Sequence, residues 1–145
     1  MFHILFLCTH NRCRSVLCEV IANSLAEGVF RASSAGSEPA GAVHPMTLQH
    51  LELRGYSTLD VRSKSMEEFA GDLPDLMVTV CDSAAAEACP VGFGGVPRLH
   101  WPLKDPSRLT VPAAQAAAFD EAIECIEQQV AEWQGLARLS SSKPA

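Results

Sequence analysis

The chain contains few charged and few aromatic residues, and it has no long hydrophobic run. Charged residues make up 19% of its 145 residues and aromatic residues 6%, whereas hydrophobic residues make up 48%. Because disordered acidic proteins have few apolar residues and more charge, this composition excludes that class. The apolar run near the start, Ile4 to Cys8, is far shorter than the roughly 20 residues that span a bilayer. We therefore expect a globular protein with no membrane partner.

Basic residues are also scarce. The chain has 11 Lys and Arg residues against 17 Asp and Glu residues, a formal net charge of -6. Nucleic-acid-binding proteins present basic surfaces that release phosphate counterions, so we expect no nucleic-acid partner. The length is that of one ordinary domain with a continuous core. We expect a monomer with a single domain over residues 1–139 and a disordered tail over residues 140–145.

Cysteine is the residue type that stands out among those present. In a short secreted chain, six cysteines would suggest a disulfide framework. Here the apolar content suffices for a core, and the first residues lack the basic region of a secretory signal. We therefore expect a cytoplasmic protein with reduced thiols, in which any pairing of cysteines is catalytic. The six are Cys8, Cys13, Cys18, Cys81, Cys89 and Cys125.

Short apolar runs alternate with helical patterns along the chain. Strands are expected at residues 2–7, 32–35, 76–81 and 97–101, and helices at residues 15–28, 45–53 and from 112 onward. This alternation predicts an α/β fold with three layers, a mostly parallel four-stranded sheet and helices on both faces. Such sheets bind ligands at the carboxyl ends of their strands, so the loop after the first strand is the favoured site.

That loop carries a cysteine and an arginine six positions apart, Cys8 and Arg14. A loop at a helix start directs unpaired N–H groups to one spot, where the helix dipole favours an oxyanion and a thiolate. Arg14 can hold two oxygens of a tetrahedral anion with its planar guanidinium, and Ser15 can donate a hydrogen bond to Cys8. The residues expected to bind the oxyanion are Thr9, His10, Asn11, Arg12, Cys13 and Arg14.

Other interpretations of the loop have less support. An ordinary turn with a buried Cys8 is the plain structural alternative, since cysteine is often buried. A zinc site built from Cys8, His10, Cys13 and Cys18 lacks the Cys-x2-Cys spacing typical of such sites. No Gly-x4-Gly-Lys motif is present, which disfavours a nucleotide-binding loop. We expect neither a metal nor a cofactor.

The segment from Cys8 to Ser15, followed by Glu19 and then by the Ser-Ala-Gly run at residues 34–36, resembles the low-molecular-weight protein tyrosine phosphatase superfamily. Asp105-Pro106 resembles the second signature of that family, where it carries its general-acid aspartate. The likeness runs from residue 2 to about residue 139. It implies a low-molecular-weight phosphatase-like fold with Cys8 as nucleophile and Asp105 as general acid. His10 departs from the pattern, because many relatives have Gly or Ala there.

Two branches of the superfamily share this loop. The phosphatase branch often carries tyrosines just after its Asp-Pro pair, whereas here Ser107 follows and Tyr56 is the only tyrosine. The segment that contains Cys81 and Cys89 resembles the redox segment of the thiol-coupled arsenate reductases. Seven residues separate the two cysteines, which is one residue more than in the best-known thioredoxin-coupled relatives. Reduction of As(V) to As(III) takes two electrons, which a dithiol supplies by forming a disulfide.

The resemblance implies a relay of thiols. Cys8 would attack arsenate while Asp105 protonates the departing oxygen, and Cys81 would then form a disulfide with Cys8. Cys89 would move the disulfide to Cys81–Cys89, where thioredoxin, glutaredoxin or a low-molecular-weight thiol could reduce it. The alternative function is a phosphatase acting on phosphotyrosine or small phosphoesters, an activity that an arsenate reductase could retain weakly. A non-catalytic oxyanion-binding module is a third class.

One further expectation concerns the back of the loop. Some relatives bind an alkali cation near the positions of Asn11, Glu19 and Ser34. Lys64 falls about where those relatives place an acidic ligand. The hypothesis is that the ammonium group of Lys64 takes the place of the ion.

Overall fold

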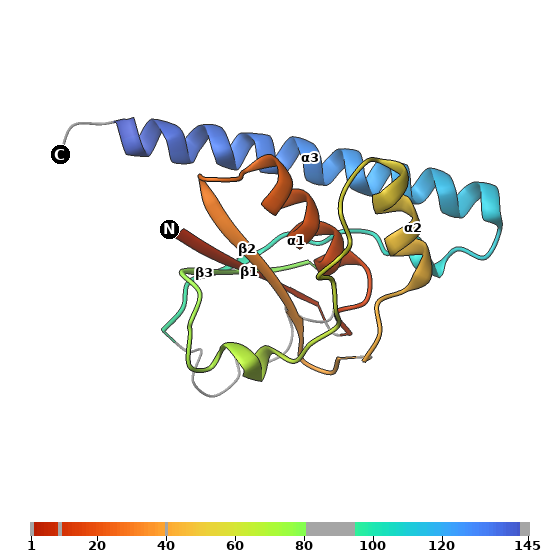
Figure 1. The fold of residues 1–145 in the computed structure, drawn as a ribbon, viewed down its shortest axis with the longest axis horizontal. Helices are drawn as coiled ribbons and strands as arrows, with labels where there is room; N and C mark the ends of the chain where they lie inside the picture. Colours follow the sequence, from red (N-terminus) through yellow and green to blue (C-terminus); the bar gives the residue numbers. More distant parts are fainter. Residues whose placement is uncertain (1, 9, 40, 81–94, 143–145) are drawn as a thin grey trace.

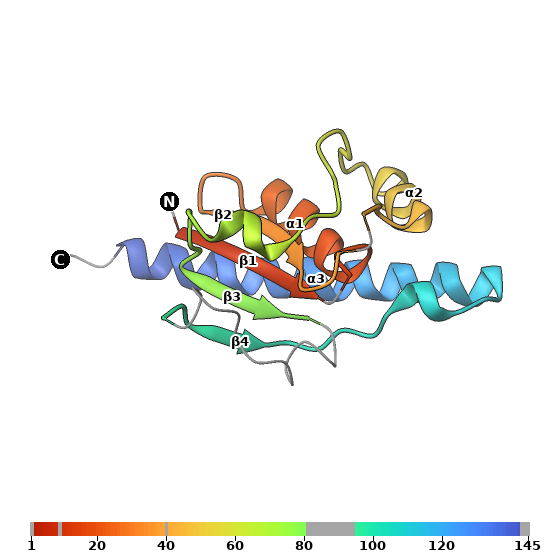
Figure 2. The ribbon, with the colours of Figure 1, turned by 90° about the horizontal axis from the view of Figure 1, so that it is seen from below.

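The computed structural model describes residues 2–8, 10–39, 41–80 and 95–142. In this part of the chain the strands form one parallel sheet in the order β2-β1-β3-β4 (Figures 1 and 2). The strands are β1 (Phe2–Cys8), β2 (Phe30–Gly36), β3 (Leu76–Thr79) and β4 (Arg98–His100). The predicted four-stranded parallel sheet is therefore confirmed. The differences at the strand ends are small.

The central position of β1 explains its sequence. It pairs with β2 on one side and with β3 on the other, and all of its residues except Phe2 are buried. A strand that is covered on both faces must be apolar throughout rather than alternating. Ile4 and Phe6 belong to the larger core cluster, whereas Leu5 and Leu7 belong to a smaller cluster. The two clusters lie on opposite faces, because successive side chains of a strand alternate.

The two faces of the sheet are covered unequally. The larger cluster combines the sheet with apolar residues of α1, α2 and α3, and α3 runs along the sheet in Figure 1. On the other face, the smaller cluster contains Met66 of the short 3₁₀ helix η1 (Met66–Phe69). Helices thus lie on both faces, as expected, although the second face carries only η1 within the described residues. The three α-helices are α1 (Arg14–Leu25), α2 (Pro45–Leu53) and α3 (Pro112–Ser142).

Helix α3 is longer than the sequence predicted. Its buried stripe contains Phe119, Ile123, Ile126 and Val130, spaced at steps of four and three as in an amphipathic helix. The helix extends to Ser142, so it includes the first three residues of the segment expected to be a frayed tail. No helix in the described ranges is both long enough and apolar enough to cross a membrane.

Candidate active site

The first loop joins the end of β1 to the start of α1, as predicted. Cys8 is the last residue of β1 and is 4% exposed, and Arg14 is the first residue of α1. The residue that precedes α1, Cys13, makes no side-chain cap hydrogen bond. The N–H groups of the first helical turn therefore remain available to an anion, and the helix dipole favours negative charge there. Within the loop, Asn11 has a φ of 48°, a left-handed conformation that asparagine tolerates better than most residues.

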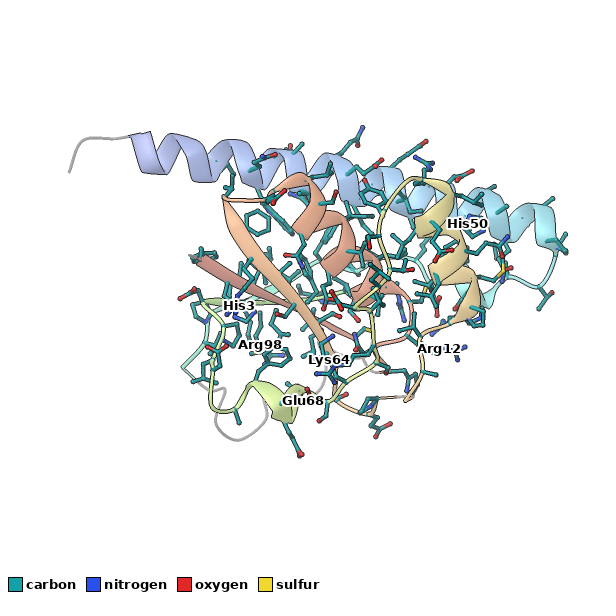
Figure 3. The ribbon with its side chains drawn as sticks, viewed as in Figure 1. His3, Arg12, His50, Lys64, Glu68 and Arg98 are labelled. Carbon is teal, nitrogen blue, oxygen red and sulfur yellow. The ribbon has the colours of Figure 1, made fainter. Side chains whose placement is uncertain are left out.

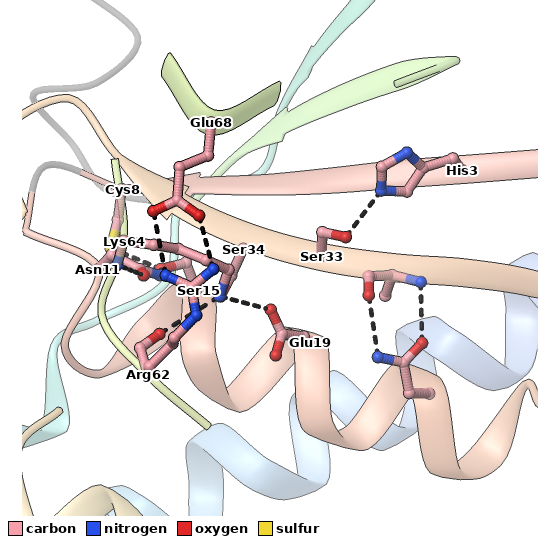
Figure 4. A network of polar contacts seen from close by, with 12 residues as sticks. His3, Cys8, Asn11, Ser15, Glu19, Ser33, Ser34, Arg62, Lys64 and Glu68 are labelled. Atoms are coloured by element: carbon pink, nitrogen blue, oxygen red, sulfur yellow. Dashed lines mark hydrogen bonds and ion pairs between the residues drawn. The ribbon is translucent and has the colours of Figure 1, made fainter. Parts of the chain in front are cut away.

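Cys8 lies at the end of a chain of hydrogen bonds (Figure 4). The Oγ atom of Ser15 is 2.9 Å from the Sγ atom of Cys8 and accepts a hydrogen bond of 2.8 Å from Nδ2 of Asn11. Because Asn11 donates to this hydroxyl, the single proton of Ser15 is free to point at the sulfur. On its other side, Asn11 accepts a 2.8 Å hydrogen bond from the backbone N–H of Lys64. This arrangement directs a hydrogen-bond donor at the sulfur of Cys8.

Cys8 and Arg14 open onto a pocket of about 370 Å³. Apart from Thr9, which lies outside the described residues, the predicted site residues of the loop lie in or directly behind this pocket, since Asn11 and Ser15 support Cys8 from within. Asp105, from the far end of the sequence, also lines it, as predicted. The lining residues are Cys8, His10, Arg12, Cys13, Arg14, Asp105, Ser107 and Arg108.

Asp105 is held at the wall of the pocket by both of its oxygens. Oδ1 accepts hydrogen bonds from the backbone N–H of Ser107 at 3.0 Å and from its hydroxyl at 2.6 Å. Oδ2 lies 3.8 Å from a guanidinium nitrogen of Arg14 and 3.6 Å from Nε of Arg108. Arg14 also donates a 3.1 Å hydrogen bond to the carbonyl of Leu103. Sequence reasoning missed Ser107 and Arg108, although both directly follow the Asp105-Pro106 pair.

The pocket thus brings together a buried thiol, an arginine and an aspartate. A family model that describes low molecular weight phosphotyrosine protein phosphatases matches residues 3–144. The chain belongs to this family.

The chain is similar to curated arsenate reductases and to solved structures of an arsenate reductase and a tyrosine phosphatase. The arsenate reductase of Brevibacillus brevis is 33% identical over 112 residues, which are 77% of this chain and 82% of the relative. The thioredoxin-dependent arsenate reductase of Corynebacterium glutamicum has a TM-score of 0.73 at 26% identity, and the match covers 97% of this chain but only 63% of that one. The tyrosine phosphatase Wzb of Escherichia coli K30 has a TM-score of 0.73 at 22% identity, covering 93% and 98% of the two chains. This last likeness shows a shared fold alone.

Behind the family's loop, Lys64 forms a sheltered ion pair. Its Nζ atom lies 3.1 Å from Oε1 of Glu19 and donates to the carbonyl of Arg62 at 3.3 Å. The same Glu19 oxygen accepts a 2.8 Å hydrogen bond from Ser34 (Figure 4). Lys64, Glu19 and Ser34 are therefore together, and Asn11 joins them through the backbone of Lys64. That the ammonium group replaces an alkali ion stays a prediction.

Two other thiols near the loop are unsuited to act as nucleophiles. Burial raises the pKa of Cys13 to about 12, and Cys13 is 2% exposed. Burial also raises the pKa of Cys18 well above its usual range. Both thiols are therefore protonated at neutral pH. Within the described residues, no group of three His, Cys, Asp or Glu side chains is placed to hold a metal ion.

Cys81 and Cys89, the two predicted relay cysteines, lie outside the described residues. The chain can be followed to Val80, whose backbone N–H donates a 2.9 Å hydrogen bond to the carbonyl of Leu7. The residue before Cys81 is thus hydrogen-bonded to the residue before Cys8, at the carboxyl ends of the inner strands β1 and β3.

Proposed function

We propose that this protein reduces arsenate to arsenite through a relay of thiols, with Cys8 as the nucleophile. The observation that carries the proposal is the position of Cys8. Its sulfur is hydrogen-bonded to Ser15 at the floor of a pocket that Arg14 and Asp105 also line. Curated relatives that are named arsenate reductases, such as the Brevibacillus brevis protein, support arsenate as the substrate.

Arsenate binds where the loop and the start of α1 present hydrogen-bond donors. The anion lies over the N-terminus of α1, where the loop N–H groups and Arg14 hold its oxygens. The guanidinium of Arg14 lies 3.8 Å from Oδ2 of Asp105. When arsenate binds, this guanidinium pairs with the substrate instead. Asp105 lies at the wall of the same pocket, where its carboxyl group can act as the proton donor.

Chemistry starts with attack of the Cys8 thiolate on arsenic. A sulfur–arsenic bond forms and one arsenic–oxygen bond breaks, and the departing oxygen takes a proton from Asp105. The thiolate of Cys81 next attacks the Cys8 sulfur. A Cys8–Cys81 disulfide forms, and the electron pair of the sulfur–arsenic bond passes to arsenic, which leaves as arsenite. The two thiols are thereby oxidised by two electrons, the number that As(V) accepts.

Cys89 then attacks Cys81, which releases Cys8 and leaves a Cys81–Cys89 disulfide. An external reductant returns this disulfide to two thiols. It is thioredoxin, glutaredoxin or a low-molecular-weight thiol, and the Corynebacterium relative is named as thioredoxin-dependent. The hydrogen bond between Val80 and Leu7 supports this order, because it ties the backbone just before Cys81 to the backbone just before Cys8.

Phosphoester hydrolysis is the second candidate, and the position of Asp105 beside Arg14 favours it as a side activity. Attack by Cys8 on a phosphomonoester needs the same anion pocket and the same proton donor. An aromatic phosphoester, however, needs a ring to stack on. His10 is the only ring-bearing side chain that lines the pocket within the described residues. We therefore expect weak activity on aryl phosphates.

The test is reductant-coupled arsenate turnover by the wild type and by Cys81→Ser, Cys89→Ser and Cys125→Ser. The relay requires that the first two variants stop after at most one turnover. Cys125→Ser serves as the matched control, because this thiol is exposed on α3 and lies outside the relay, so it should retain wild-type turnover. Sustained turnover by both Cys81→Ser and Cys89→Ser would rule out the relay. A fourth variant, Cys8→Ser, should be inactive, and sustained turnover by it would rule out Cys8 as the nucleophile.

A further inference from the structure

The pocket is larger than a single oxyanion. Arsenate and phosphate have five heavy atoms, which at about 30 Å³ each, the volume of a water molecule in the liquid, fill roughly 150 Å³. The pocket measures about 370 Å³, which is within the range of small-molecule sites. Space therefore remains between an anion bound at Cys8 and the outer residues His10, Arg12 and Arg108.

The outer part of the pocket is cationic in an otherwise acidic protein. Among the described residues, three arginines line the pocket against one carboxylate, that of Asp105, while the whole chain has a formal net charge of -6. An oxyanion bound at Cys8 uses Arg14 alone among the three. The charges of Arg12 and Arg108 therefore remain for another anionic group.

Arg108 has hydrogen-bonding groups to spare. It contacts Asp105 through Nε at 3.6 Å, and its side chain is 73% exposed. Within the described residues, neither of its terminal amino groups has a hydrogen-bond partner. These two groups can donate to two oxygens of one ligand, which is the geometry that guanidinium groups favour with phosphates.

The backbone of Arg12 is held in place, whereas its side chain has no hydrogen-bond or ion-pair partner among the described residues. Its carbonyl accepts hydrogen bonds from the backbone N–H of His44 at 2.9 Å and from the hydroxyl of Thr47 at 3.3 Å. The start of α2 thus holds this residue in place, and Figure 3 shows Arg12 beside that end of α2. The side chain is exposed and lines the pocket. Such anchoring keeps a cationic group at the rim at little further cost in backbone entropy.

From these observations we propose that Arg12 and Arg108 form a second anion subsite, which accepts small molecules that carry two linked tetrahedral anions, the diphosphate class. One anion lies over Cys8 and the other between the two outer arginines. The proposal rests on the proposed function, since it requires that Cys8 and Arg14 hold the first anion. Such ligands compete with arsenate for the site.

The test compares two non-hydrolysable ligands that differ by one anionic group, methylphosphonate and methylenediphosphonate. Calorimetry on the reduced wild-type protein should show tighter binding of the diphosphonate, by about 10-fold or more. Arg12→Gln and Arg108→Gln should each lower this ratio by about 3- to 10-fold, because each removes one charge-assisted contact. Arg98→Gln is the matched control, since it removes the same charge from an exposed position on β4 that does not line the pocket. It should keep the wild-type ratio.

Three outcomes contradict the proposal, and they can be told apart. If the wild type binds both ligands equally, no second subsite exists. If Arg98→Gln lowers the ratio as much as Arg12→Gln and Arg108→Gln do, the preference reflects the overall charge of the protein. If methylphosphonate neither binds nor inhibits arsenate turnover, the oxyanion site at Cys8 is itself wrong, and the subsite fails with it.

Discussion

Cys8 differs from the other described cysteines in what its sulfur contacts. Cys13 and Cys18 are buried, and burial raises the pKa of both thiols. The sulfur of Cys8 is as well shielded from water, but it faces the hydroxyl of Ser15 and the start of α1. We expect the reactivity of Cys8 to depend on the hydrogen-bond donors directed at its sulfur and not on its exposure.

Replacement of Ser15 by alanine should slow the reaction of Cys8. The variant loses the hydroxyl that donates to the sulfur, and a hydrogen bond to a charged group contributes about 1.5–3 kcal/mol. The rate of alkylation of Cys8 by iodoacetamide at pH 7, followed by mass spectrometry, should fall by about 10-fold or more. Ser24→Ala, at an exposed position of the same helix, should leave the rate unchanged. Equal rates for both variants would show that Ser15 does not stabilise the thiolate.

At the scale of elements, a polar network fastens the loop to its surroundings. Glu19 of α1 accepts hydrogen bonds from Ser34 of β2 and from the side chain of Lys64, which belongs to the segment before η1. The backbone of Lys64 in turn donates to Asn11 in the loop. One lysine thus joins a helix, a strand and the active-site loop. The side chain of Lys64 is 9% exposed and that of Glu19 is 15% exposed. If the lysine is lost, little water can therefore reach the carboxylate of Glu19 to solvate its charge.

Replacement of Lys64 by glutamine should destabilise the protein and make it responsive to potassium. The variant leaves the carboxylate of Glu19 sheltered without its cation, which we expect to lower the free energy of unfolding by about 2–4 kcal/mol. Urea unfolding in KCl and in choline chloride measures both effects. If the ammonium group occupies the position of an ion, potassium should restore part of the stability of Lys64→Gln and leave the wild type unchanged. A rise in wild-type activity or stability with potassium would contradict the hypothesis.

At the scale of the whole molecule, the two ends of the sheet carry different polar groups. The candidate active site lies at the carboxyl ends of the strands, and His3 lies near the amino end of β1 (Figure 3). His3 is 3% exposed, and its ring contacts Ser33 at 2.8 Å and Arg31 at 3.1 Å. Burial lowers the pKa of His3 below its ordinary value of 6.5, and the charge of Arg31 lowers it further, against the opposite effect of Asp72 and Asp75. The folded state therefore favours the neutral form of the His3 ring.

This shift makes stability depend on pH. Because the pKa of His3 is lower in the folded than in the unfolded chain, the unfolded chain binds more protons as the pH falls below about 6.5. The free energy of unfolding should therefore decrease as the pH is lowered from 7.5 to 5.5. His3→Gln should flatten this dependence in urea titrations at each pH, whereas His100→Gln, at an exposed position on β4, should retain the wild-type slope. An unchanged slope in His3→Gln would assign the effect to other groups.

The sequence by itself determined the local features of this protein. Apolar runs of strand length and helical periodicity depend on nearest neighbours along the chain, so the order of elements and the Cys8-to-Arg14 loop could be predicted. Asp105 could be placed at the site only through its resemblance to a family signature. The tertiary structure alone decided that Oδ2 of Asp105 lies between Arg14 and Arg108, that Lys64 pairs with Glu19, and that the α-helices gather on one face of the sheet. These contacts join residues far apart in the chain, and they exist only when packing of the whole core brings the segments together.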